Sequence, residues 1–200
     1  MIFLCHLNRN PDLETVTIDI NNKLIEKACR GDQKAMYRLY SMYLPAMYNT
    51  CIRMVVNKND AEDIIQESFI SAFSGIEGFR GEASFGTWLK RIVINNSINH
   101  IRNKKIQFVD MDTIQIDDTD SEDDDLPDIP MEVIHNSIKS LPDKSRVVLN
   151  LYLLEGYLHR EIALMLGIAE STSRSQYIRA KKLLKEILLR KYHHITGGSC

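Results

Sequence analysis

The sequence has few cysteines, and they are not arranged for a disulfide framework or a metal site. No CxxC pair occurs, and no cysteine and histidine cluster has the spacing of metal ligands. The four cysteines are scattered singly, at Cys5, Cys29, Cys51 and Cys200. This pattern is typical of reduced thiols in the cytoplasm, so we expect no disulfide, no metal ion and no other cofactor.

Long hydrophobic runs are also missing. No stretch approaches the roughly 18 apolar residues of a membrane-spanning helix. The apolar start MIFLCHL is too short for the core of a secretion signal, and polar residues and Pro11 follow it at once. We therefore expect a cytoplasmic protein that is neither exported nor inserted in a membrane.

Proline and glycine are scarce, with five and nine residues in a chain of 200, of which 44% are hydrophobic and 26% charged. Such a composition favours a helical protein of one or two domains. Apolar residues recur at helical spacing from Leu24 to Ile52, and the Gly31-Asp32 pair interrupts them. The sequence predicts an all-α fold with two small helical domains.

Charge is strongly segregated along the chain. Between Ile106 and Pro130 there are ten acidic residues and no lysine or arginine, which leaves net charges of +3 in residues 1–105 and +5 in residues 131–200. A charge block of this kind is typical of a flexible linker, either a solubilising spacer or a functional polyanion, and it lacks the spacing of a calcium loop. We divide the chain into an N-terminal arm (1–20), a first domain (21–105), an acidic linker (106–130), a second domain (131–193) and a tail (194–200).

A helix-turn-helix motif is predicted between Tyr157 and Leu188. Ile162 and Leu166 lie on the apolar side of a first short helix, Gly167 allows a tight break, and a second helix starts near Glu170. The second helix offers hydrogen-bond donors and cations suited to the major groove of DNA. The residues predicted to contact DNA are Ser171, Thr172, Arg174, Ser175, Gln176, Arg179 and Lys182.

Two features of this motif leave alternatives open. Exposed lysine and arginine are also the ordinary covering of a solvated helix in a helical bundle. Ser173 stands where many helix-turn-helix units have a β-branched core residue, so looser packing is expected there.

A strip of amides and arginines is predicted along a helix that starts after Ser84. Phe85 and Leu89 belong to its buried stripe, and a neighbouring strip holds polar residues that suit unpaired nucleic acid. This strip contains Trp88, Arg91, Asn95, Asn99 and Arg102. The tryptophan is more typical of the core than of a stacking surface, and two of the asparagines are also candidates for plain surface residues.

The helix before this strip is predicted to begin at Asn59 or Asp60 and to have two unlike faces. Ile65 and Phe69 point inward, whereas the outer face is acidic. That face comprises Asp60, Asp63 and Glu67, with Gln66 at its edge. An acidic face is in most proteins simply solvated.

Three segments together resemble the extracytoplasmic-function (ECF) sigma factors of bacterial RNA polymerase. They are DAEDIIQESFISAF (Asp60–Phe73), FRGEASFGTWLKRIVINNSINHIR (Phe79–Arg102) and the stretch Leu141–Leu184 that contains the helix-turn-helix. The resemblance implies a specificity subunit without an active site, whose partners are core RNA polymerase, promoter DNA and an anti-sigma factor. It implies no small-molecule substrate.

The resemblance also implies residue roles. Residues 21–105 match sigma region 2, in which Asp60, Asp63, Gln66 and Glu67 match the helix that binds the β′ coiled coil of core polymerase, beside further contacts with the β subunit. Residues 131–193 match region 4, whose second helix reads the −35 element. The acidic linker matches a segment that threads toward the polymerase active-site channel, where a polyanion can imitate RNA. The residues matched to the −10 element are Phe79, Arg80, Trp88, Arg91, Asn95, Asn99 and Arg102.

Two other function classes remain. A conventional helix-turn-helix regulator would bind duplex DNA by itself and would not need the segment from Phe79 to Arg102. A nuclease that uses the acidic run with a divalent metal would need carboxylates fixed on structured elements, and this run has little apolar content to fix them.

Overall fold

The computed structural model describes residues 21–104 and 129–196, with side chains up to residue 191. Within these ranges every regular element is a helix, which confirms the all-α expectation. The predicted N-terminal arm (1–20), residues 106–128 of the predicted linker and residues 197–200 of the predicted tail lie outside the described residues, as does residue 105.

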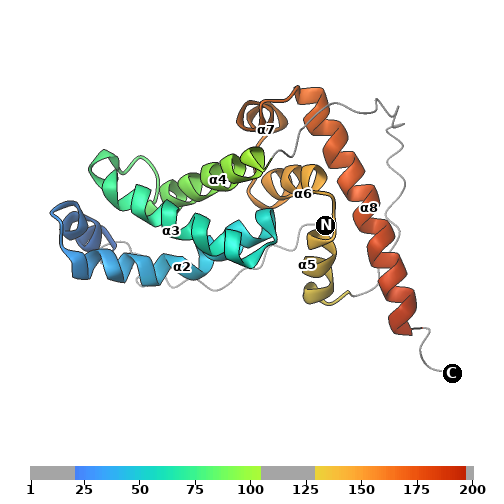
Figure 1. Ribbon diagram of the computed structural model, residues 1–200, viewed down its shortest axis with the longest axis horizontal. Helices are drawn as coiled ribbons and strands as arrows, with labels where there is room; N and C mark the ends of the chain where they lie inside the picture. The colour runs from blue at the N-terminus through green and yellow to red at the C-terminus, as the bar shows by residue number, and fades with distance from the viewer. Residues whose placement is uncertain (1–20, 105–128, 197–200) are drawn as a thin grey trace, which may run out of the picture.

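The N-terminal domain is a bundle of helices around one apolar core (Figure 1). Its elements are a helix at residues 21–29, α2 (Gln33–Val55), α3 (Lys58–Ser74), the short 3-10 helix η1 (Ile76–Gly78) and α4 (Phe85–Asn103). Asp32 caps α2, and Ser84 caps α4 as predicted. The α3 helix begins earlier than the predicted Asn59 or Asp60, because the side chain of Asn57 accepts hydrogen bonds from the next amides.

The C-terminal domain consists of shorter helices packed on one long helix. Its elements are α5 (Met131–Lys139), α6 (Asp143–Leu149), a π-helical turn η2 (Asn150–Leu154), α7 (His159–Leu166) and α8 (Glu170–Thr196). Ile138, Leu141, Leu149 and Ala180 form the core between α5, α6 and α8. This core holds α8 by its inner side and leaves the opposite side of the helix to solvent.

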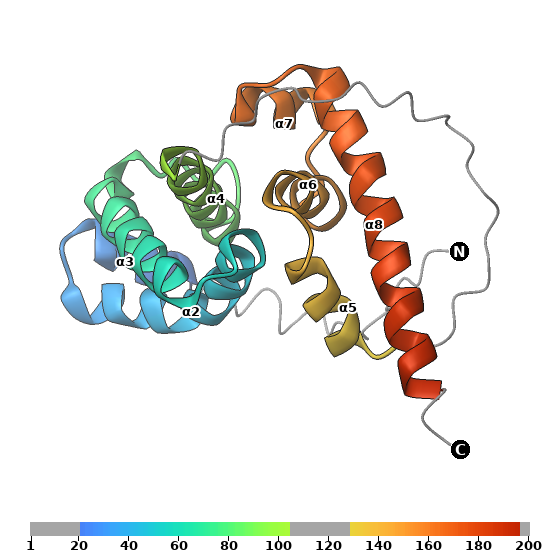
Figure 2. The same ribbon diagram turned by 45° about the vertical axis from the view of Figure 1, so that its right-hand side comes forward.

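The two domains share a third apolar cluster. In both views α6 lies between the N-terminal bundle and α8, and α7 lies beside the end of α4 (Figures 1 and 2). No buried member of the cluster is more than 3% exposed, so the contact resembles a protein core. Its members are Met54, Ile94, Ile98 and Ile101 from the first domain, and Val147, Val148, Leu151, Ile162 and Leu166 from the second.

Candidate functional site

The candidate functional residues lie on helix faces. In residues 21–104 and 129–191 no group of three or more histidine, cysteine, aspartate or glutamate side chains could hold a metal ion. No helix in the described part of the chain has the length and apolar character needed to cross a membrane.

The break between α7 and α8 has the predicted geometry. Gly167 adopts a left-handed conformation with φ 67° and ψ 39°, and the Ile168 N–H donates to the carbonyl of Ala163 at 3.0 Å. At the other end of α7 the Glu161 carboxylate accepts the Leu158 N–H at 2.7 Å. Both ends of this short helix are therefore fixed, which confirms the predicted helix-turn-helix. A side chain at position 167 would strain the turn.

The interior of the motif contains a polar contact that the sequence did not suggest. Ser173 is fully buried, and its hydroxyl lies 2.9 Å from Nδ1 of His159. The His159 ring stacks on Tyr152, with ring centroids 4.2 Å apart and planes inclined by 9°. The looser packing expected at Ser173 is wrong, because Ser173 is fully buried and its hydroxyl is paired with His159. His159 and Tyr152 are structural residues that the sequence reasoning missed.

We expect the C-terminal domain to lose stability as the pH falls below about 6.5, the ordinary histidine pKa. Burial and the nearby Arg174 lower the pKa of His159 in the folded chain, so the unfolded chain binds the proton more readily. The stabilisation is therefore complete above pH 6.5 and is lost as the pH falls through the folded pKa. The unfolding temperature, measured at several pH values, should fall less steeply toward acid pH for His159→Asn than for the parent. The exposed His135→Gln is the control and should show the same pH dependence as the parent. Equal slopes for His159→Asn and the parent would contradict this assignment.

The outer face of α8 presents donors and cations. Ser171, Arg174, Ser175, Arg179 and Lys182 are exposed. The Arg174 guanidinium lies 2.6 Å from the Glu170 carboxylate one turn earlier, and an exposed ion pair of this kind contributes little stability. The arginine can therefore exchange the carboxylate for a phosphate or a base edge. Thr172, also predicted to contact DNA, is only half-buried.

Gln176 is placed differently from the other residues predicted to read DNA. Its side-chain carbonyl accepts a hydrogen bond from the Ser145 hydroxyl of α6 at 2.9 Å. At about 100° per residue, Gln176 lies roughly 120° around the helix from Lys182, on the side that packs against α6. Gln176 therefore also ties α8 to α6, and its predicted contact with DNA stays a prediction.

Four polar residues of α4 form one exposed line, which we call the α4 strip: Arg91, Asn95, Asn99 and Arg102. The helix contains no acidic residue, so no carboxylate on α4 itself competes for the two guanidinium groups. Asn96, one residue away from the strip, instead donates to the Ser68 hydroxyl of α3 at 3.0 Å. The two neighbouring asparagines thus differ in role: Asn96 joins two helices and Asn95 faces outward.

Trp88 lies at the edge of the core, next to the α4 strip. The ring is half-buried, 5.4 Å from Phe79 and 5.5 Å from Phe85 between centroids. Arg80 is exposed in the loop that carries Phe79, where Gly81 has a φ of 72°. The structure brings this loop and the tryptophan together at one end of the α4 strip.

The acidic face of α3 surrounds an exposed apolar residue. Asp63, Gln66 and Glu67 are exposed, and Ile70, 67% exposed, follows Gln66 and Glu67 by one helical turn. An exposed apolar residue beside a carboxylate and an amide can belong to a protein-binding surface. Sequence reasoning missed Ile70, although its helical position beside Glu67 could have revealed it.

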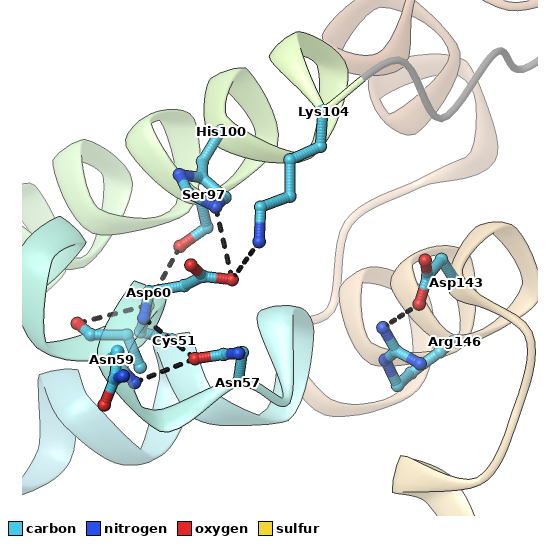
Figure 3. Close-up of polar contacts among 10 residues, drawn as sticks. Cys51, Asn57, Asn59, Asp60, Ser97, His100, Lys104, Asp143 and Arg146 are labelled. Carbon is cyan, nitrogen blue, oxygen red and sulfur yellow. Dashed lines mark hydrogen bonds and ion pairs between the residues drawn. The ribbon is translucent and has the colours of Figure 1, made fainter.

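Asp60 differs from the other three residues predicted for this face. Its carboxylate binds the Lys104 ammonium and lies 3.4 Å from Nε2 of His100, both at the end of α4 (Figure 3). The hydrogen bond from Lys104 is the main cause of a lowered pKa for Asp60. The Asn57 cap sets Asp60 in the first turn of α3, beside the end of α4, so Asp60 ties the two helices together. Its predicted contact with core polymerase stays a prediction.

Known proteins with related sequences cover both domains. The family model described as Sigma-70 region 2 matches residues 39–106, and that described as Sigma-70, region 4 matches residues 131–184. The chain is 31% identical to the ECF RNA polymerase sigma-E factor of Haemophilus influenzae over 174 residues, which are 81% of this chain and 92% of that protein. It is 30% identical to the RNA polymerase sigma-H factor of Pseudomonas aeruginosa over 185 residues, which are 86% of this chain and 96% of that protein.

Among solved structures, the sigma factor RpoE in complex with the anti-sigma factor NepR from Bartonella quintana has a TM-score of 0.49 and 20% sequence identity, over 78% of this chain and 97% of that chain. The sequence relatives carry the assignment, because they match along nearly their whole length and in both regions. The chain belongs to the ECF group of the sigma-70 family and is a sigma factor that directs promoter-specific initiation of transcription, without enzymatic activity of its own.

Proposed function

We propose that the α4 strip contacts the opened −10 element of the promoter. The observation that carries this proposal is the exposed line of two amides and two guanidinium groups on a helix without acidic residues. Amides hydrogen-bond to the edges of unpaired bases, and guanidinium groups hold the sugar-phosphate backbone. Phe79, Arg80 and Trp88 lie at the end of this line, where a base taken out of the stack would find an aromatic surface.

We further propose that the outer face of α8 reads the −35 element as duplex DNA. Arg174, Arg179 and Lys182 supply the cations, while Ser171, Thr172 and Ser175 supply hydroxyl groups. Gln176 positions this face by its hydrogen bond with Ser145. We propose residues 21–105 as region 2 and residues 131–193 as region 4, the two domains that carry these roles.

Arg174→Ala should weaken binding to a promoter by about 10- to 100-fold and relax base selectivity within the −35 element, the range expected for an arginine that contacts a base edge. Promoter binding by the reconstituted polymerase, measured on matched and mutated −35 sequences, tests this. Arg190→Ala is the control, because this exposed arginine lies four turns later on the same helix. If the variant loses the same affinity on every −35 sequence, Arg174 contacts phosphates and not base edges.

We propose that core RNA polymerase binds the face formed by Asp63, Gln66, Glu67 and Ile70 through the β′ coiled coil, with additional contacts to the β subunit. The acidic ring favours a cationic partner, and Ile70 offers an apolar anchor within it. Asp60 supports this face by tying the start of α3 to the end of α4.

We propose that the protein works in the cytoplasm and is restrained there by an anti-sigma factor. Membership of the ECF group supports such a partner, which would cover polymerase-binding surfaces. The acidic linker is proposed to follow the polymerase channel as a polyanion.

Reconstitution with bacterial core polymerase on genomic DNA fragments tests the proposed function. Transcript starts that depend on this chain, with −35 and −10 elements upstream, are the expected result. Gel shifts without polymerase separate this reading from a conventional regulator, which would bind duplex DNA by itself. Tight duplex binding without polymerase, together with no dependent transcript start, would reject the proposal.

A further inference from the structure

The helix at residues 21–29 and the start of α2 enclose a groove that none of the contacts proposed above uses. Figure 1 shows the two helices folded back beside each other, at a turn in which Gly31 has a φ of 84°. The groove has a volume of about 670 Å³. Leu24 and Ala35, 9% and 2% exposed, line it with apolar side chains, and Tyr37, 70% exposed, adds an aromatic ring. A ligand with apolar side chains would bury them here.

The rim of the groove is cationic. Lys27, Lys34 and Arg38 line it with exposed side chains. In the described part of the chain none of these three cations forms an ion pair. Asp32, which also lines the groove, caps α2 by accepting the N–H groups of Lys34 and Ala35 at 2.8 and 3.2 Å. The groove therefore favours a ligand that is both acidic and partly apolar.

A protein segment fits this groove better than a nucleic acid does. A phosphate at the start of a helix binds free amide groups, and at the start of α2 the Asp32 carboxylate already accepts them. The same carboxylate repels a phosphate that enters the groove. Aliphatic side chains, in contrast, fit the apolar lining, while carboxylates on the same segment reach the cations of the rim.

The segment that precedes the helix at residues 21–29 has this chemistry. Residues 11–20, with the sequence PDLETVTIDI, contain three acidic residues and no lysine or arginine. Val16, Ile18 and Ile20 alternate with polar residues, which is typical of an extended segment that buries one side. The segment is therefore complementary to the groove in charge and in apolar content.

This segment also joins the chain beside the groove. Asn21 precedes Leu24 by three residues, or about 4.5 Å along a helix, and its amide group donates to the Tyr43 hydroxyl at 3.5 Å. Ten extended residues reach about 33 Å, so residues 11–20 are long enough to turn back into the groove. A ligand tethered so closely has an effective concentration in the millimolar range, at which weak contacts suffice for binding.

We propose that residues 11–20 dock in the groove between the helix at residues 21–29 and α2, with their aliphatic side chains against its apolar lining and their carboxylates at its cationic rim. The contact is independent of the DNA and polymerase contacts proposed above. It also helps to hold the helix at residues 21–29 in place, because a helix of nine residues is too short to be stable alone.

Photo-crosslinking within the full chain tests the proposal. p-Benzoylphenylalanine in place of Tyr37 puts a reactive ring at the groove, and irradiation should link it to residues 11–20, located by mass spectrometry of the tryptic peptide 10–23. The same replacement at Ile70, an exposed site on α3, is the control and should not give this link. Mixing isotopically light and heavy chains distinguishes a link within one chain, the expected result, from a link between two copies.

Charge reversal tests the complementarity. Lys34→Glu combined with Arg38→Glu should lower the linked fraction to about half or less, because two weak attractions at the surface become repulsions. Adding Asp12→Lys and Glu14→Lys to the same chain should restore the link. If the reversed variant loses helical circular dichroism, the parent in about 1 M salt replaces it, because salt screens the same attractions.

The control for the reversal is Lys58→Glu combined with Arg190→Glu, at side chains that are 76% and 77% exposed, and it should leave the linked fraction unchanged. A ring at position 37 that gives no link to residues 11–20, or links only between different chains, would overturn the proposal. A link to residues 106–130 in place of residues 11–20 would overturn it as well and assign the groove to the acidic linker. A linked fraction that neither charge reversal nor salt changes would overturn the role of the cationic rim.

Discussion

Replacing both Asn95 and Asn99 with alanine should lower the yield of open promoter complexes by about 100-fold while leaving the binding of core polymerase intact. Each asparagine is exposed on the α4 strip, and a side chain that reads a base contributes about 1–3 kcal/mol. The loss should fall on strand opening, because the amides face bases that become accessible only when the duplex is melted. Duplex binding through α8 should persist.

Permanganate reactivity of unpaired thymines measures opening, and a competition assay with labelled chain measures core binding. Asn103→Ala is the matched control, since Asn103 is exposed and ends the same helix. Asn96→Ala tests the structural role of the neighbouring asparagine. It removes the hydrogen bond to Ser68 and should reduce the free energy of unfolding by about 1 kcal/mol. If the double variant opens promoters as well as the parent, the α4 strip does not contact the −10 element.

Reversing two charges on α3, with Asp63→Lys and Glu67→Lys, should weaken the binding of core polymerase by about 100-fold or more. Both carboxylates are exposed beside Ile70, so the reversal turns attraction to a cationic partner into repulsion. The bundle should remain folded, because substitutions at exposed positions away from caps and networks change stability little. Ile70→Ala should weaken binding further through loss of the apolar anchor.

The control for this reversal is Glu26→Lys, which makes the same kind of change at an exposed position of the helix at residues 21–29. Asp60→Asn distinguishes a structural role of Asp60 from a direct contact with core polymerase. It removes the ion pair with Lys104 and should lower thermal stability at neutral pH. Because the pKa of Asp60 is lowered in the folded chain, this stabilisation is lost only as the pH falls through that lowered pKa. Unchanged core affinity in the double charge reversal would exclude the acidic face as the polymerase contact.

The helices and the helix-turn-helix could be predicted because their causes are local. Gly167 adopts the left-handed turn that its lack of a side chain permits, and Ser84 caps the helix that follows it. The buried stripe of α4 follows from apolar residues at helical spacing, which one helix displays without any partner.

Other contacts could not be predicted because the two partners lie far apart in the sequence. Asp60 meets Lys104 after 44 residues, and Gln176 meets Ser145 across 31 residues. Spacing on one helix shows which way a side chain points, but it does not show which helix stands opposite. His159 at the buried Ser173 is a case of the same kind, because helical periodicity does not predict a stacked aromatic pair between helices.

By itself the sequence determined that this chain is helical, that it ends in a helix-turn-helix, and that it resembles sigma factors, because periodicity, capping and motif order are properties of contiguous segments. Only the tertiary structure decided that the two domains are docked. Contacts between the domains join Arg53 to Glu155 across 102 residues and set Arg146 at the end of a helix of the other domain. Such contacts depend on where separate helices come to rest, since a buried charge selects its partner by position in space.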